Sequence, residues 1–240
     1  MTDKAPLAVI TGASGGIGRA LAEYHAAKGG DLILAARRAV ELDALKADIE
    51  AKHSVSVTPV ACDLGTPEGL ATLIAGGRGA FIERHLADDL AMVDLNVNAV
   101  MILCHAIAPG MVARGGGRIL NVGSTAGMMP GPMQATYFAT KAFVNSFSQA
   151  LDEELRAQGV TVLAPGYVET DFAARADLEN TPLTRSGQSP EAVARVGYDA
   201  MMDGRLHVVN EGMLSVLTNW VIPLLPRRQV LKMVRKMQTK

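Results

Sequence analysis

Short apolar runs alternate along the chain with longer segments in which apolar residues recur every three or four positions. The runs hold four to seven residues and are rich in Val, Ile, Leu and Ala. Continuous apolar runs of this kind are typical of strands that are buried on both faces of a sheet. We predict strands at 7–11, 32–36, 55–61, 118–123, 160–164 and 207–210.

The segments between these runs have the length and the spacing of amphipathic helices. Alternation of buried strands and helices predicts a parallel sheet covered by helices on both faces, and the right-handed crossover rule makes it doubly wound. We therefore expect one α/β domain of the Rossmann type over residues 1–240. The main predicted helices cover about 17–28, 40–52, 67–76, 85–113 and 135–157.

The first predicted strand leads into a glycine-rich turn, TGASGGIG (11–18), which opens the first predicted helix. Residues without a Cβ let the backbone approach a pyrophosphate, and the helix N-terminus supplies free N–H groups and a positive dipole end. The place of this turn between a strand and a helix predicts a dinucleotide site. The predicted cofactor contacts here are Gly12, Ser14, Gly15, Gly16, Ile17 and Gly18.

The second predicted strand ends in Arg37 and Arg38. Dinucleotide folds that prefer NAD usually place Asp or Glu here to bind the ribose 2′-hydroxyl, and Asp31 lies at the wrong end of the strand. A guanidinium group suits a 2′-phosphate because it forms charge-assisted, forked hydrogen bonds. We predict NADP(H) in preference to NAD(H), with Arg37 as the main contact; the alternative is that both arginines are solvated. Asp63 either borders the adenine, which we favour, or caps the next helix.

Several motifs follow one another along the chain in a characteristic order. They are the glycine-rich turn, Ser124 in NVGSTAG, Tyr137-x-x-x-Lys141, and PGYVET at residues 165–170. Together they resemble the short-chain dehydrogenase/reductase family, and the match covers nearly the whole chain. The resemblance implies an oxidoreductase that acts on a carbonyl or a secondary alcohol.

The residue types in these motifs suit proton transfer to a carbonyl oxygen. Tyr137 and Lys141 are four residues apart and therefore share one helix face. A free tyrosine has a pKa near 10, and we expect the nearby ammonium to lower the pKa of Tyr137, so that it acts as general acid or base. Ser124, thirteen residues earlier, ends a predicted strand, where its hydroxyl is expected to bind the substrate oxygen.

Further roles are implied by the resemblance alone. Lys141 would also bind the nicotinamide ribose, together with Tyr137 at the same end of the cofactor. Asn96 in DLNVNAV would anchor a water in a proton relay. The nicotinamide end of the cofactor would be held by Pro165, Gly166, Val168 and Thr170.

One expected family element is missing from the sequence. The family carries a further strand with an NNAG-like turn between the motifs that contain Asp63 and Asn96, and these residues are only 33 apart here. A smaller shortage lies between Gly159 and Pro165. Two explanations are open. The sequence omits residues, which we favour, and the chain is then interrupted at Gly77–Arg78. Alternatively, the molecule is shortened and its sheet is rearranged.

The C-terminal third carries a polar segment at about 169–190, in which we expect a loop that shapes substrate specificity. A helix should follow, with Ser189 as its N-cap and Pro190 in its first turn. The tail, about 213–240, is apolar and then basic and amphipathic. We favour a helix that packs on the core or on a second subunit; alternatives are an apolar wall for a lipophilic substrate and attachment to an anionic membrane surface.

Composition and charge narrow the class of protein. The net charge of −1 over 240 residues gives no reason to expect nucleic acid, and scattered histidines predict no metal site. Two cysteines in apolar stretches, the lack of a signal-peptide pattern and the lack of a membrane span predict a cytoplasmic protein. From the family we expect a homodimer or homotetramer through helices 85–113 and 135–157. The alternative to an enzyme is a catalytically impaired nucleotide-binding or interaction protein on the same fold.

Overall fold

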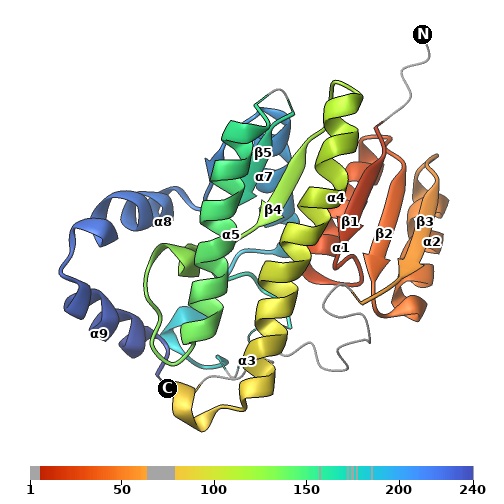
Figure 1. Cartoon of the computed structure of the whole chain (residues 1–240). Helices are drawn as coiled ribbons and strands as arrows, with labels where there is room; N and C mark the ends of the chain where they lie inside the picture. The colour runs from red at the N-terminus through yellow and green to blue at the C-terminus, as the bar shows by residue number, and fades with distance from the viewer. Residues whose placement is uncertain are drawn as a thin grey trace.

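The computed structural model describes residues 6–63, 79–156, 158–171, 173, 176, 178–184 and 186–239. Its strands form two parallel sheets of three strands each, in the orders β1-β2-β3 and β4-β5-β6 (Figure 1). Every described strand lies within a predicted run, and the α/β class with a Rossmann-type arrangement is confirmed. The strands are β1 (Ala8–Thr11), β2 (Leu32–Ala36), β3 (Val57–Ala61), β4 (Ile119–Val122), β5 (Val160–Leu163) and β6 (His207–Val208).

The helices also follow the predicted segments. Ser189 Oγ accepts a hydrogen bond from the Ala192 N–H at 3.2 Å, so the predicted N-cap is confirmed. The helix predicted at 67–76 lies outside the described residues. The described helices are α1 (Gly16–Ala27), α2 (Ala39–Lys52), α3 (Leu86–Val93), α4 (Ala99–Ala113), α5 (Ala135–Glu154), α7 (Pro190–Met202), α8 (Gly212–Val216) and α9 (Arg227–Met237).

The first sheet is held by one apolar cluster between β2 and the helices beside it. Leu32 and Leu34 of β2 pack with Leu42, Leu45 and Ile49, which recur every three or four residues along α2. All five are buried, and burial of each such side chain stabilises the fold by about 1.5–3 kcal/mol. This packing fixes the end of β2, from which the two predicted cofactor arginines emerge.

The division into two sheets differs from the single sheet that the sequence predicts. No strand in the described part of the chain joins β1 to β4, so both are edge strands. Residues 64–78 lie outside the described residues, and with them the chain interruption predicted at Gly77–Arg78, which stays a prediction. At the second shortage, Gly159 has φ +78° and its N–H donates to the Leu155 carbonyl at 3.1 Å, and β5 begins at the next residue.

The long helix predicted at 85–113 is confirmed as a continuous helical rod, Leu86–Ala113. It consists of α3, a π-helical turn at Asp94–Asn98, and α4, and it lies beside α5 (Figure 1). By its length and its mean hydropathy of 1.7, this rod could cross a membrane. Only 22% of its most apolar stretch is buried inside the protein, whereas a core helix would be mostly buried. The absence of a membrane span therefore stays a prediction.

Candidate active site

The carboxyl ends of five strands open into a cavity of about 870 Å3. Its walls come from the glycine-rich turn after β1, the ends of β2 and β3, the segments after β4 and β5, and the C-terminal tail. In open α/β sheets the ligand crevice lies at this end of the strands, since the loops there converge on the helix N-termini. All the predicted cofactor and catalytic residues except Asn96 and Gly18 line this cavity.

The glycine-rich turn has the backbone that a pyrophosphate cradle needs. Gly12 and Gly16 have φ values of +65° and +53°, in the left-handed region that favours glycine. A Cβ on Gly18 would lie 2.4 Å from the Gly12 carbonyl oxygen, so this position admits no side chain. The turn then opens α1 with its N–H groups directed to the cavity end of the helix. The donor set therefore fits a dinucleotide phosphate.

The two arginines after β2 are held differently. Arg38 Nη2 donates to the Ser14 carbonyl at 2.9 Å and to Ser14 Oγ at 3.2 Å, and Arg38 Nη1 pairs with Glu41 at 3.1 Å. Arg38 thus braces the glycine-rich turn. Arg37 and Asp63 line the same end of the cavity. Their predicted contacts with the 2′-phosphate and the adenine stay predictions.

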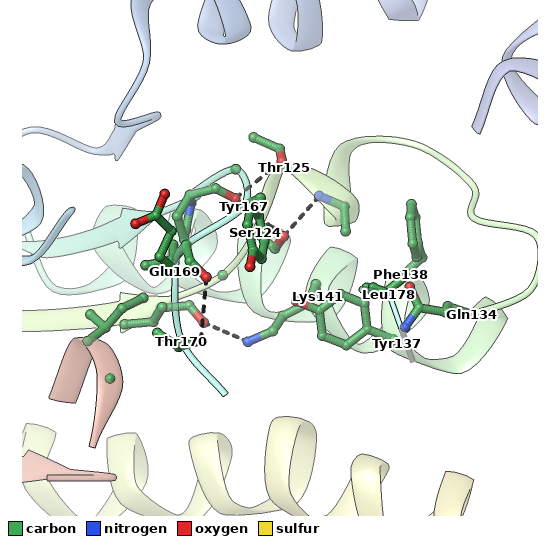
Figure 2. Close-up of a pocket in the computed structure, with 18 of the residues that line it drawn as sticks. Ser124, Thr125, Gln134, Tyr137, Phe138, Lys141, Tyr167, Glu169, Thr170 and Leu178 are labelled. Atoms are coloured by element: carbon green, nitrogen blue, oxygen red, sulfur yellow. Dashed lines mark hydrogen bonds between the residues drawn. The ribbon is translucent and has the colours of Figure 1, made fainter. Parts of the chain in front are cut away.

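Ser124 is fixed by its neighbours on three sides. Its N–H donates to Asn145 Oδ1 at 3.4 Å, and its carbonyl accepts from Asn145 Nδ2 at 2.9 Å. Its Oγ accepts from the Ala126 N–H at 3.0 Å and donates to the Pro165 carbonyl at 3.4 Å. The side chain is 7% exposed and lines the cavity beside Tyr137 (Figure 2). The hydroxyl is therefore positioned before any substrate arrives.

Tyr137 shares a hydrogen bond with Ser124, and its ionisation differs from our prediction. Burial raises the pKa of Tyr137 above its ordinary value, and the hydrogen bond from Ser124 lowers the pKa by less. The sequence predicts a lowered pKa because of Lys141, and that prediction is wrong for the protein without cofactor. Lys141 Nζ lies 6.0 Å from the centre of the Tyr137 ring, and desolvation outweighs an ammonium at that range.

Lys141 lies on the same face of α5, one turn beyond Tyr137, as predicted. Its Nζ donates to the Val122 carbonyl at the end of β4 at 3.0 Å (Figure 2). Burial in the cavity lowers the pKa of Lys141 from 10.5 to about 8, because charging an ammonium away from bulk water is unfavourable. The amine thus stays mostly protonated at pH 7 and loses its proton near pH 8.

Asn96 lies in the π-helical turn of the long rod, outside the cavity wall. Its Nδ2 donates to Thr140 Oγ1 at 3.1 Å, and Thr140 Oγ1 donates to the Tyr137 carbonyl at 2.9 Å. The chain of bonds therefore joins the rod to the catalytic turn of α5. The neighbouring Asn98 instead donates from its Nδ2 to Asp94 Oδ1 at 2.7 Å. The water relay predicted for Asn96 stays a prediction.

The PGYVET segment closes the cavity on the side of β5. Gly166 N–H donates to Asn210 Oδ1 at 3.1 Å, and a Cβ on Gly166 would lie 2.6 Å from a Leu214 methyl carbon. The Thr170 methyl group lies 3.3 Å from the position of a Cβ on Gly16, so this segment touches the glycine-rich turn. Pro165 and Val168 line the same wall, and a single parallel bridge pairs Val168 with Gln188.

The C-terminal tail packs on the core and also lines the cavity. Phe138 of α5 forms a buried cluster with Ile222, Val230 and Val234, against which Tyr137 is partly packed. The tail therefore packs on the core, as we favoured, and its apolar side chains also form part of the cavity wall. The tail residues that line the cavity are Leu214, Leu217, Thr218, Ile222, Met233, Val234, Met237 and Gln238.

Sequence reasoning missed two polar residues near the centre. Asn145 clamps Ser124, and its signal was a polar residue on the apolar face of α5, four residues after Lys141. Gln134 is 4% exposed and lines the cavity just before α5 (Figure 2); no sequence pattern marks it. In the described part of the chain no group of three His, Cys, Asp or Glu side chains could hold a metal ion.

Comparisons with a family profile and with known relatives indicate the same family. The family profile described as short chain dehydrogenase matches residues 6–81 and 74–181. The two matches meet in the stretch where the expected strand is missing. A very-long-chain 3-oxoacyl-CoA reductase of Homo sapiens is 33% identical to this chain, over 89% of this chain and 76% of its own length.

Two solved structures share both the fold and part of the sequence. A short-chain dehydrogenase from Sphingobium yanoikuyae in complex with NADPH has a TM-score of 0.80 and 29% identity, covering 88% of this chain and 90% of its own. The L-sorbose reductase of Gluconobacter frateurii, complexed with NADPH and L-sorbose, has a TM-score of 0.72 and 26% identity, covering 88% and 97%. The chain therefore belongs to the short-chain dehydrogenase/reductase family, as an oxidoreductase that acts on C=O or CH–OH groups with a nicotinamide dinucleotide.

Proposed function

We propose that this protein is an NADP(H)-dependent carbonyl reductase in which Tyr137 is the proton donor. The hydrogen-bonded pair of Ser124 and Tyr137 on the wall of a large cavity carries this proposal. The raised pKa of Tyr137 keeps its phenol protonated at neutral pH, as proton donation to a carbonyl oxygen requires. The same group would accept the proton of an alcohol in the reverse direction, at higher pH.

Different residues of the chain would bind the substrate, transfer the proton and hold the cofactor. Ser124 Oγ would turn its hydroxyl proton from the Pro165 carbonyl, a long bond of 3.4 Å, to the substrate oxygen and stabilise its developing negative charge, while Tyr137 delivers the proton. Lys141 adds positive charge behind Tyr137 once its amine is protonated. The turn at Gly12–Gly18 and Thr170 would hold the two ends of the cofactor, and Arg37 would bind a 2′-phosphate, which favours NADP(H). When bound, the cofactor supplies the hydride that reduces the carbonyl carbon.

The substrate that we propose is lipophilic, with a long-chain 3-oxoacyl thioester as the specific candidate. The cavity wall contributed by the tail is apolar, with Leu214, Leu217, Ile222 and Met233 beside Phe138. Apolar area on this scale favours an alkyl chain, since each buried CH2 is worth about 0.8 kcal/mol. The name of the human relative, a very-long-chain 3-oxoacyl-CoA reductase, supports this class.

The decisive experiment follows NADPH oxidation by its absorbance with 3-oxoacyl thioesters of increasing chain length, and with aldehydes, ketones and diketones. We expect kcat/KM to rise with chain length. Tyr137→Phe should lose about 10²–10⁴-fold in kcat while it still binds NADPH. Tyr167→Phe, which removes another phenol of the cavity wall, is the matched control and should stay active.

Two outcomes would contradict the proposal. Tight NADPH binding without turnover of any carbonyl would favour the catalytically impaired binding protein. Turnover that is unchanged in Tyr137→Phe would exclude Tyr137 as the proton donor.

A further inference from the structure

The outer face of α8 and the turns that follow it carries large apolar side chains in solvent. Met213, Trp220 and Leu224 are 88%, 73% and 85% exposed, and Val216 and Leu217 are 57% and 40% exposed. These positions recur at intervals of three, four and seven residues, so they form one continuous face. The opposite side of the same segment, with Leu214, Thr218 and Ile222, lines the cavity.

The charges of the tail all have one sign. Six of the chain's 23 Lys and Arg residues, and none of its 24 Asp and Glu residues, follow Gly212. Gly212–Leu224 contains no charged residue at all, and α9 comes directly after it. Figure 1 shows α8 and α9 projecting together from the side of the molecule, away from the strands. The exposed basic side chains of α9 are Arg227, Arg228, Lys232, Arg235 and Lys236.

We propose that α8, the turns through Leu224 and α9 dock on an anionic phospholipid bilayer. Exposed apolar side chains with a tryptophan enter the headgroup region, and adjacent lysines and arginines bind lipid phosphates and carboxylates. A second copy of this chain fits the face poorly. A two-fold contact brings the same patch against itself, which here would place two basic tails together. An anionic surface instead complements the charge.

The docking has a consequence for the cavity, because one short segment separates it from the bilayer. Leu217 belongs to both surfaces: it is 40% exposed and it lines the cavity. A lipophilic molecule dissolved in the bilayer would therefore meet the apolar wall of the cavity without crossing bulk water. This surface is distinct from the catalytic residues, so its loss leaves the chemistry intact.

The test is co-sedimentation of the full-length protein with vesicles of phosphatidylcholine alone and of phosphatidylcholine mixed with phosphatidylserine. We expect binding only to the mixed vesicles, weakened by added salt. Arg228→Ala with Lys232→Ala should reduce the partition coefficient about fivefold for each residue. Trp220→Ser with Leu224→Ser should reduce it at least about tenfold, because the large apolar side chains are lost.

Matched controls change the same residue types elsewhere on the exposed surface. Arg114→Ala with Arg205→Ala, and Val40→Ser with Ile82→Ser, should bind vesicles as the unmodified protein does. All variants should reduce a water-soluble carbonyl at an unchanged rate without vesicles, which verifies folding. Equal binding to both vesicle types, or wild-type binding by the tail variants, would overturn the proposal. The proposal would also be overturned if the protein bound no vesicles and formed a dimer that Trp220→Ser dissociates.

Discussion

Asn145 and Ser124 are joined by two hydrogen bonds, in which the amide of Asn145 donates to the Ser124 carbonyl and its oxygen accepts from the Ser124 N–H. Asn145 is 6% exposed, and a Cβ on Gly123 would lie 1.9 Å from its Oδ1. The end of β4 is therefore locked to α5 at the position where Ser124 meets Tyr137. This contact makes Asn145 a positioning residue for the hydroxyl of Ser124.

Asn145→Ala should lower kcat about 10–100-fold while the Kd for NADPH stays the same. The substitution leaves both backbone groups of Ser124 without their partner, at a cost of about 1–3 kcal/mol in folding free energy. Ser124 then no longer holds its hydroxyl toward the substrate oxygen. Steady-state kinetics and urea unfolding measure the two effects separately.

The control for that change is Gln149→Ala. Gln149 Nε2 donates to the Asn145 carbonyl at 2.8 Å, one turn farther along α5, but it has no bond to Ser124. Its loss should leave kcat unchanged. If Asn145→Ala and Gln149→Ala lower stability equally and neither changes kcat, Asn145 is only a packing residue.

Ser124→Ala should raise the pKa of Tyr137 further. The hydrogen bond with Ser124 lowers this pKa against burial, so its removal favours the protonated phenol. In the alcohol-oxidation direction the rise of kcat with pH should move to higher pH, and kcat/KM should fall about 10²-fold. A profile that keeps its midpoint would disprove the electrostatic coupling. Thr125→Val, which loses only a 3.2 Å bond to the Pro165 carbonyl, serves as the comparison.

The two arginines after β2 should respond differently to alanine. Arg37→Ala should weaken NADPH binding at least about tenfold and leave NADH binding unchanged, because only NADPH carries the 2′-phosphate. Arg38→Ala should weaken both cofactors, because Arg38 braces Ser14 in the glycine-rich turn. Fluorescence titration with both cofactors measures this. Equal affinity of the unmodified protein for NADH and NADPH would exclude the assignment of Arg37.

Lys141 should make the stability of the cofactor-free protein increase with pH above about 8. The folded protein releases the proton of Lys141 near pH 8, while the unfolded chain keeps it up to its ordinary pKa of 10.5. Between these values the unfolded chain binds more protons, so the free energy of unfolding rises with pH, by at most about 1.4 kcal/mol per unit. Urea unfolding at pH 7, 8 and 9 should show this rise. It should be absent in Lys141→Met, and a parallel rise in both proteins would assign it to another group.

Much of the fold follows from local pattern. The run LILAA forms β2 at Leu32–Ala36 without a shift, because a short apolar run after Gly29-Gly30 and before the charged Arg37-Arg38 favours a buried strand. Tyr137 and Lys141 share a helix face for the same kind of reason, since a spacing of four fixes their relation once α5 forms. The glycine-rich turn could be predicted because its backbone conformation requires residues without a Cβ, and these are visible in the sequence.

Other features depend on contacts between distant segments. The sign of the pKa shift of Tyr137 was predicted wrongly, since the spacing to Lys141 says nothing about how deeply the ring is buried. The partner of Ser124 lies 21 residues away in Asn145, a separation with no periodic signal. The pairing of strands into two sheets likewise depends on which edges meet.

The sequence by itself determined the α/β class, the order of strands and helices, and a set of candidate site residues, most of which line the cavity, because periodicity and side-chain type act locally. Only the tertiary structure decided that the tail returns over α5 to line the cavity, that Arg38 braces the glycine-rich turn, and that burial governs the ionisation of Tyr137 and Lys141. Burial and long-range pairing are properties of the assembled chain, and no single segment encodes them.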